Sequence, residues 1–474
     1  MSNAQKSASE ETYDNRFWSI LKEAIRGSDR DFTKGSVSLA VFLLAVPMIL
    51  EMIMESVFAV VDVYFVASLG AIAVAVVGIT ESMMALVYAV AIGISIGATA
   101  TVSRRIGEKD PEGAAKSATH AIYIGLAASL IMGAVGIIFA STFLTLLGAE
   151  PDVVREGTLF AQLMLGGNFV VVFLFLLNAI FRGAGDAAIA MRVLWISNIL
   201  NCILDPLLIF GIWIFPELGV TGAAVATLIG RGIGVIYAGY KLFFGEKRFE
   251  IRREHWKFDT ERFRRLLSIS WVAVLQFIVG TASWVGLMVV VAGFGSEAVA
   301  GYTIGIRIII FALLPAVGLS NAAATLVGQN LGAKQPGRAE KSVWRAAYYN
   351  AICQTAIGIL FAVFAAPIAS IFTSEPAVLA YATDALRIIS YGFFFYAIGM
   401  VLETSFNGAG DAWTPTYLNL FVFWIFEIPL AYVLAYYFGF GAHGVFWAIT
   451  IAFSLLAVLS TILFKRGKWK LTEV

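Results

Sequence analysis

The stretch Val37–Leu69 reads VSLAVFLLAVPMILEMIMESVFAVVDVYFVASL and decides the fold class. It is apolar and long enough to cross a lipid bilayer as a helix, which takes about 20 residues. It nevertheless carries three acids, Glu51, Glu55 and Asp62. A helix turns about 100° per residue, so Glu55 lies about 40° and Asp62 about 20° from Glu51, on one stripe. Because an acid at membrane depth costs roughly 3 kcal/mol on insertion scales, this stripe should face a wet cavity or protein partners.

The composition is typical of a helical membrane protein. Of the 474 residues, 59% are hydrophobic and 14% are charged, against about 25% charged residues in soluble proteins. The apolar runs are long and continuous, unlike the short alternating strands of a membrane barrel. The net charge of +1 gives no case for a nucleic-acid partner. Two cysteines imply no disulfide framework, and three scattered histidines lack metal-ligand spacing.

Twelve membrane-spanning helices are expected, arranged as two sets of six. The residues before the first apolar run are polar and mixed in charge, with no visible cleavable signal peptide. A basic segment, Gly245–Arg265, is the only long charged interruption and separates the two sets. The expected organisation is an N-terminal tail at 1–36, an N-lobe at 37–240, a linker at 241–265, a C-lobe at 266–464 and a C-terminal tail at 465–474.

Lysine and arginine fall almost entirely on one side of these twelve spans. The tails and the even-numbered loops hold nearly all of them, whereas the odd-numbered loops hold a single one, Arg155. Cytoplasmic loops carry the excess of Lys and Arg in membrane proteins. The distribution therefore predicts a multi-pass protein of the cell (inner) membrane, with both termini and the linker in the cytoplasm.

The two halves share an internal repeat. FRGAGDA at Phe181–Ala187 recurs as FNGAGDA at Phe406–Ala412, an offset of 225 residues, and at the same offset Gly107 meets Gly332. An offset of six spans places equivalent loops on the same membrane face, so the repeats are parallel. The fold class is thus an all-α polytopic membrane protein with two parallel six-helix repeats. Two such bundles around a central cavity form a V-shaped, two-lobe transporter layout.

The fifth span of the first half carries a second polar stripe. Asn198, Asn201 and Asp205 fall at i, i+3 and i+7, and Pro206 follows directly. The proline removes a backbone donor and frees a carbonyl for water or an ion. For a single asparagine in a span, an interhelical hydrogen bond is the favoured interpretation. For an aspartate that interpretation is weaker, because a buried carboxylate needs a cation or a proton.

Asp62 has no acidic counterpart in the second half, since the position 225 residues on is Leu287. A functional role is therefore favoured for Asp62. For Glu51 and Glu55, a wet vestibule without a specific role is an equal alternative.

The second half has its own acids within the predicted spans, Glu403 and Glu427. Each could bind a cationic substrate, or could be protonated and hydrogen-bonded within the protein. An aromatic cluster that includes Tyr396 would suit planar organic cations, although helix packing is the default interpretation.

The chain resembles the multidrug and toxic compound extrusion (MATE) transporters over residues 33–464. Together the matching segments are specific. In the first half they are VDVYFVASLG at Val61–Gly70, GISIGATATVSRRIGE at Gly93–Glu108, NAIFRGAGDA at Asn178–Ala187, NCILDPLLIFG at Asn201–Gly211 and GVTGAAVAT at Gly219–Thr227, and in the second half GQNLGAK at Gly328–Lys334 and FNGAGDA at Phe406–Ala412.

The resemblance implies two six-helix lobes in a V and cation-driven export of amphipathic organic compounds. Pro47 matches the family proline at which the first span bends. In the proton-coupled, DinF-like branch the first lobe carries the coupling site, and its pattern maps here onto Asp62, Asn178, Asn201, Asp205 and Thr227. The NorM-like branch has an acid in span 7, where this chain has none, and another in span 10, where this chain has Tyr396. Glu51 and Glu55 match no family role.

The function expected is secondary antiport by alternating access of the two lobes, not enzymatic catalysis. An amphipathic cationic compound would leave in exchange for H⁺, or for Na⁺ held at Asp62 and Asp205, and no other cofactor is expected. The substrate cavity is expected to include Glu51, Glu55, Tyr396, Glu403 and Glu427. The alternative is a lipid or lipid-linked oligosaccharide flippase of the same superfamily, which twelve spans and acidic residues disfavour. The expected partners are a small-molecule substrate and the bilayer, and the expected state is a monomer.

Overall fold

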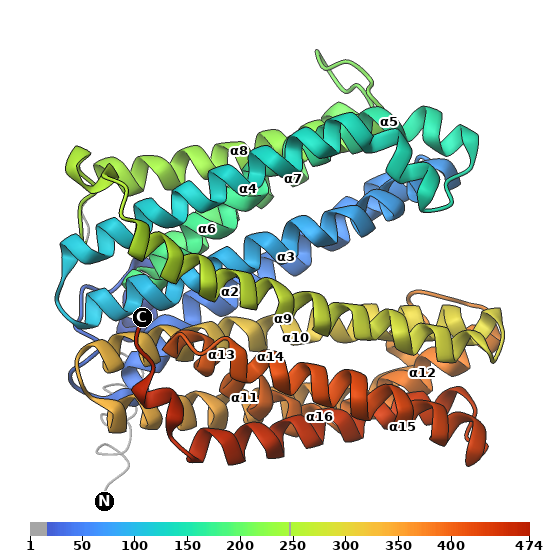
Figure 1. Cartoon of the computed structure of the whole chain (residues 1–474). Helices are drawn as coiled ribbons and strands as arrows, with labels where there is room; N and C mark the ends of the chain where they lie inside the picture. The colour runs from blue at the N-terminus through green and yellow to red at the C-terminus, as the bar shows by residue number, and fades with distance from the viewer. Residues whose placement is uncertain (1–16, 246–247) are drawn as a thin grey trace, which may run out of the picture.

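The computed structural model describes residues 17–245 and 248–474, and these residues form a helical molecule with two lobes (Figure 1). Of the predicted N-terminal tail, residues 1–16 lie outside the described part, as do residues 246–247 of the predicted linker. Residues 17–26 are helical. The helices of the first half are α2 (Val37–Ala67), α3 (Ala71–Gly107), α4 (Pro111–Leu146), α5 (Pro151–Gly166), α6 (Asn168–Ala184), α7 (Ala187–Ile209) and α8 (Val220–Phe244).

The second half begins with a short 3₁₀ turn, η1 (Arg253–Trp256), and ends with another, η4 (Lys468–Leu471). Between them the chain includes two π-helical segments, η2 and η3, which interrupt one span. The order is α9 (Thr260–Ala292), α10 (Ser296–Gly332), α11 (Pro336–Ala369), α12 (Pro376–Ser390), α13 (Phe393–Ala409), α14 (Trp413–Asn419), η2 (Leu420–Glu427), α15 (Ile428–Tyr432), η3 (Val433–Tyr437) and α16 (Ala442–Lys465).

The described residues provide the twelve spans that the hydropathy pattern predicts. Eleven helical stretches are long and apolar enough to cross a membrane, and the pair α12 and α13, bent by 61°, makes the twelfth. Helix bounds also repeat between the halves. Both ends of α3 recur 225 residues later in α10, and both ends of α6 recur at the same offset in α13. The all-helical, duplicated fold class is therefore confirmed.

The repeated GAGD motif ends equivalent helices in the two halves. Gly185 terminates α6 at φ 91° and Gly410 terminates α13 at φ 89°. Only glycine adopts this left-handed conformation without a steric penalty, which explains its place in the motif. As a result, α6 includes Arg182 in its last turn and ends at Ala184.

Helices enter the predicted linker from both sides, since α8 extends to Phe244 and α9 begins at Thr260. Asp259 sets the start of α9, because its side chain accepts hydrogen bonds from the backbone N–H groups of Glu261 and Arg262. The bond from the Arg262 N–H is the main reason that the pKa of the Asp259 carboxyl is lowered.

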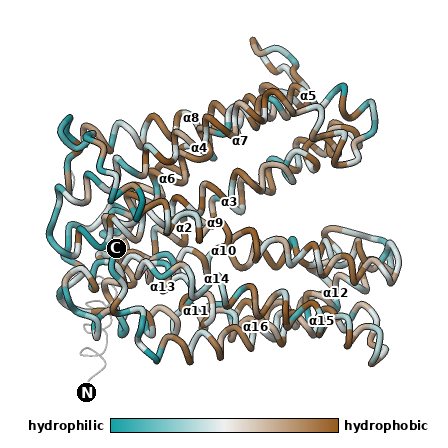
Figure 2. Tube along the Cα trace, viewed as in Figure 1, coloured by the Kyte–Doolittle hydropathy of each residue, from teal (hydrophilic) through white to brown (hydrophobic). Residues whose placement is uncertain are grey.

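The two lobes converge on the side where the C-terminus lies and spread apart on the other (Figure 1). Hydrophilic residues gather on the converging side, while the spans are mostly hydrophobic (Figure 2). Gln329 of α10 donates a hydrogen bond to the Gly183 carbonyl at 3.0 Å, and Thr325 donates to the Arg182 carbonyl at 3.2 Å. These bonds join the two lobes on the converging side.

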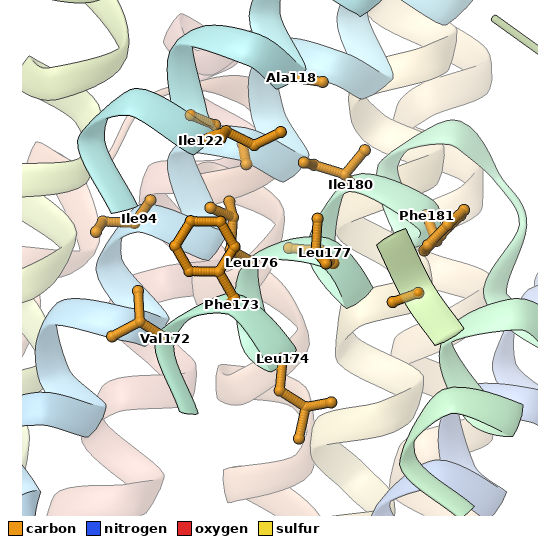
Figure 3. Packing of buried hydrophobic residues seen from close by; sticks show 14 of the residues in the cluster. Ile94, Ala118, Ile122, Val172, Phe173, Leu174, Leu176, Leu177, Ile180 and Phe181 are labelled. Carbon is orange, nitrogen blue, oxygen red and sulfur yellow. The ribbon is translucent and has the colours of Figure 1, made fainter. Parts of the chain in front are cut away.

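Side chains from α3, α4 and α6 pack together in the largest core of the N-lobe (Figure 3). This packing holds the three helices in place.

Candidate cation-coupling site and substrate cavity

The first acid of the α2 stripe, Glu51, is paired inside the N-lobe. Its side chain is 1% exposed. Arg182 on α6 donates to Glu51 Oε1 from Nη1 at 2.8 Å, and Asn178 on the same helix donates to that oxygen at 3.3 Å. Glu51 Oε2 is buried and has no hydrogen-bond partner among the described residues. The arrangement joins α2 to α6 just after Pro47, through which α2 continues as a helix.

The second acid, Glu55, joins α2 to α7 and α8. Asn198 Nδ2 donates to Glu55 Oε2 at 2.9 Å, and Arg231 Nη2 donates to Glu55 Oε1 at 3.3 Å. The guanidinium of Arg231 lies over the ring of Phe58, with 5.3 Å between its Cζ and the ring centroid. Two of the three acids of the stripe, Glu51 and Glu55, therefore face protein partners, as their insertion cost predicts.

Asp205 on α7 is fully buried, beside Asn201 and Thr227. The Asn201 side chain lies 3.0 Å from Thr227 Oγ1. With the amide oriented to satisfy both of its ends, Asn201 Nδ2 donates to Asp205 Oδ2 at 2.7 Å, and its oxygen accepts from Thr227 Oγ1 and from the Thr227 N–H. Asp205 Oδ1 stays buried without a partner in the described chain. One carboxylate oxygen is thus free for a proton or a cation.

Asp62, two turns beyond Glu55 on α2, is half-buried and has no hydrogen bond or ion pair with another described residue. It lies within electrostatic range of Asp205 on α7, Glu81 on α3 and Arg231 on α8. Two acids that repel each other in a low-dielectric environment are stabilised when they share a proton or a cation. Carboxylate, amide and hydroxyl oxygens are the ligands that a hard monovalent cation prefers. The described residues nevertheless include no group of three acids, histidines or cysteines placed to hold a metal ion.

The structure therefore brings together three of the five predicted coupling residues by hydrogen bonds, Asn201, Asp205 and Thr227. Asp62 lies in their electrostatic range. The fifth, Asn178, is hydrogen-bonded to Glu51.

Two site residues were missed from the sequence, Arg182 and Arg231. Arg182 falls within the repeated motif, where the second copy has Asn407, and this difference between the repeats is a signal that could have identified it. Arg231 is a charge inside an apolar span, which is itself a signal of function.

A cavity of about 220 Å³ lies in the C-lobe. Tyr396, Glu403 and Glu427 all line it, together with Gln276 and Asn419, whereas Glu51 and Glu55 do not. Three buried acceptors in this lining have no partner among the described residues, Glu403 Oε1, Gln276 Oε1 and Asn419 Oδ1. Buried acceptors of this kind are normally satisfied, so the cavity suits a molecule that donates hydrogen bonds, whether water or a ligand.

Aromatic rings form much of the remaining wall of this cavity. Tyr396 stacks on Phe453 with 3.9 Å between the ring centroids, and both residues line the cavity beside Phe277, Trp284 and Phe423. Two residues of α3, Ile92 and Ile96, complete the wall from the other lobe. Carboxylates within an aromatic wall are a suitable environment for an amphipathic cation.

Two parallel six-helix lobes with buried acids inside their spans are the layout of a membrane transporter. The chain belongs to the MatE family, because the MatE model matches it once in each half, at residues 47–207 and 273–433. The matches cover more than half of its length. This protein is accordingly a multi-pass membrane transporter of that family and not an enzyme.

Similar proteins include transporters with named cargo. The chain is 26% identical over 434 residues to "Probable multidrug resistance protein NorM" of Thermotoga maritima, covering 90% of this chain and 92% of that one. It is 27% identical over 405 residues to "FAD transporter" of Shewanella oneidensis, covering 85% and 88%. A solved structure described as the outward-facing conformation of a multidrug resistance MATE family transporter superposes with a TM-score of 0.88, at 25% identity, covering 93% and 98%.

Proposed function

We propose that this transporter exports amphipathic organic cations in exchange for H⁺ or Na⁺, with Asp62 and Asp205 as the coupling carboxylates. The observation that carries the proposal is the network of Asn201, Asp205 and Thr227, which leaves Asp205 Oδ1 without a partner beside Asp62. Neutralising this pair removes the repulsion between α2 and α7, so ion binding favours one conformation of α2. A transported compound that favours the other conformation is then exchanged for the ion.

The C-lobe cavity is the proposed contact for the cargo. Glu403 and Glu427 would pair with its positive charge, and the aromatic wall around Tyr396 would cover its apolar part. The cavity has about the volume of a compact ring system and opens beside α3, so the cargo can be transferred as the lobes move. These acids disfavour an anionic cargo at this place, and the same feature makes a flippase for lipid-linked sugars the weaker candidate.

Dye efflux from proteoliposomes tests the proposed exchange. Purified protein would be reconstituted, loaded with a fluorescent organic cation, and placed in an imposed H⁺ or Na⁺ gradient. We expect efflux to follow one of the two gradients and to stop when an ionophore dissipates it. Efflux that is indifferent to both gradients would contradict antiport.

We also propose that the protein acts as a monomer in the cell membrane with both termini cytoplasmic, which makes the spread side of the lobes the outer side. In a background without Cys202 and Cys353, a new cysteine at Glu156 should be labelled in intact cells by an impermeant maleimide. One at Lys257 should be labelled only after the cells are opened, because it lies in the basic linker. Labelling in the reverse pattern would overturn the topology.

Glu403→Gln should change which compounds are exported while leaving the response to the ion gradient in place. We expect export of a monovalent cationic dye to fall about tenfold relative to a neutral one, because a buried charge partner is removed. The measurement is the ratio of the two export rates at a fixed gradient. Glu375→Gln, an exposed acid of the same lobe, is the matched control and should leave that ratio unchanged. Uncoupling of transport from the gradient by Glu403→Gln would instead move the driving site to the C-lobe.

A further inference from the structure

Arg231 is a buried charge of the N-lobe whose hydrogen-bond donors are only partly used. It lies in the middle of α8, its side chain is 3% exposed, and guanidinium groups keep their charge in proteins. Its hydrogen bond to Glu55, at 3.3 Å, uses Nη2 alone. Nε and Nη1 are buried and have no hydrogen-bond partner in the described part of the chain. The guanidinium therefore has donors ready for a second acceptor.

The other buried ion pair of α2, between Glu51 and Arg182, differs in this respect. Arg182 approaches Glu51 to 2.8 Å, and no nitrogen of Arg182 is left buried without a partner. A buried guanidinium with unused donors is destabilising, because their lost hydration is not replaced. Such an arrangement is expected where a second partner is engaged in another state of the protein.

The surroundings of Arg231 identify that second partner. The ionisable groups around it are Glu55 and Asp62 on α2 and Tyr88 on α3. Glu55 already accepts from Arg231. The Tyr88 hydroxyl is close enough to interact with the guanidinium, but it is neutral at ordinary pH and supplies no counter-charge. Asp62 is the one acid of the three-membered stripe on α2 without a hydrogen bond or ion pair among the described residues.

The groups that face Asp62 from other helices do not compete for this role. Asp205 and Glu81 are acids and repel it, and Cys202 on α7 is an ordinary thiol. Arg231 is a cation that acts electrostatically on Asp62 and favours its ionised form. Asp62 also follows Glu55 by two turns on the same face of α2, so a change in the bend or position of α2 would carry either acid towards Arg231.

We propose that Arg231 is a positioning residue that alternates between Glu55 and Asp62 during transport. It pairs with Asp62 when that carboxylate is ionised and has no coupling ion. It returns to Glu55, the arrangement seen here, when a proton or a cation occupies Asp62. Arg231 is then a built-in counter-charge with which the coupling ion competes, and the exchange of partners moves α2 against α8. This inference rests on the proposed coupling role of Asp62.

Two neutralising variants test the exchange because their expected effects are opposite. Arg231→Gln removes the competitor, so the coupling ion should reach half-maximal export at about a tenfold lower concentration, the effect of a unit charge over about 10 Å at an effective dielectric of about 20. Glu55→Gln frees Arg231 to stay with Asp62, so about tenfold more ion should be needed. For a proton these changes are about one pH unit, towards higher and lower pH respectively. Arg231→Lys keeps the charge and should lie close to the wild type.

The double variant Glu51→Gln with Arg182→Gln is the matched control, since it removes the other buried ion pair of α2 as a unit. Its half-maximal ion concentration should stay within about twofold of the wild type, because neither residue faces Asp62. Size-exclusion profiles and thermal unfolding of each purified variant would show that it is folded. If Arg231→Gln is poorly folded, the half-maximal ion concentration of Glu55→Gln can still be compared with that of Arg231→Lys. The proposal requires the value for Glu55→Gln to be the higher of the two.

Shifts of Arg231→Gln and Glu55→Gln in the same direction, or no shift in folded protein, would overturn the exchange of partners. Asp62→Asn separates this failure from failure of the proposed function. If Asp62→Asn abolishes coupled export while neither neutralising variant moves the ion dependence, the coupling site stands and the role of Arg231 falls. If Asp62→Asn exports normally, the coupling site itself is misplaced.

Discussion

Asp62→Asn should abolish export against a gradient in protein that still folds and reaches the membrane. Asparagine has the shape of a protonated aspartate, so it imitates the ion-occupied state permanently and cannot release the ion. Asp62 is half-buried and without a hydrogen bond in the described structure, so the substitution breaks no contact. The measurement is efflux of a fluorescent cation from proteoliposomes under H⁺ and Na⁺ gradients, and the rate should fall to that of empty liposomes.

Asp205→Asn should give the same loss, and the double variant should be no worse than either single one. Non-additive effects are the signature of residues that act as one unit. Glu375→Gln, which removes an exposed acid far along the chain from both, serves as the control for expression and reconstitution. Normal export by Asp62→Asn under either gradient would exclude it as a coupling residue and direct attention to Glu403 and Glu427.

The acidic stripe of α2 and the network around Asp205 show how much of the site local spacing can predict. The turn of a helix places Glu51, Glu55 and Asp62 on one face whatever the tertiary structure, and the same holds for Asn201 and Asp205. The insertion cost of these acids then requires partners or water. Spacing therefore predicted which residues face inwards, and the parallel repeat predicted the two lobes.

The partners of these residues could not be predicted in the same way, because they depend on the rotation and height of one helix against another. Glu51 meets Arg182 and Glu55 meets Arg231 across pairs of helices that are far apart in sequence. Arg182 belongs to the last turn of α6, because the left-handed turn that ends this helix lies at Gly185. Asn178 belonged to the expected coupling set and is found beside Glu51 for the same reason.

Irregular backbone in the C-lobe was equally hidden from the sequence pattern. The predicted tenth span is bent by 61° between α12 and α13, at Tyr391 and Gly392, although the two helices together are long and apolar enough for one span. The π-helical segment η2 ends at Glu427, and its wider turns change the direction in which the following side chains point. A regular period of 3.6 residues therefore cannot place Glu427 in the cavity, whereas the structure does.

Arg182→Leu should destabilise the N-lobe more than any other single substitution considered for this chain. It leaves the carboxylate of Glu51, which is 1% exposed, with a single hydrogen bond from Asn178. Removing one partner of a buried ion pair typically costs about 3–5 kcal/mol, because the remaining charge stays desolvated. The expected result is a large fall in the midpoint of thermal unfolding of purified protein, compared at one scan rate because unfolding of membrane proteins is seldom reversible.

The double variant Glu51→Leu with Arg182→Leu should recover most of that loss, because replacing both charges by apolar side chains removes the desolvation cost of the pair. Arg155→Leu is the control, since Arg155 pairs with Asp152 at 3.0 Å with both side chains well exposed. Its effect should be within about 1 kcal/mol, as for surface ion pairs in general. If Arg182→Leu unfolds at the temperature of the wild type, Glu51 must be protonated in the folded protein, because only a neutral acid could remain there without its guanidinium partner.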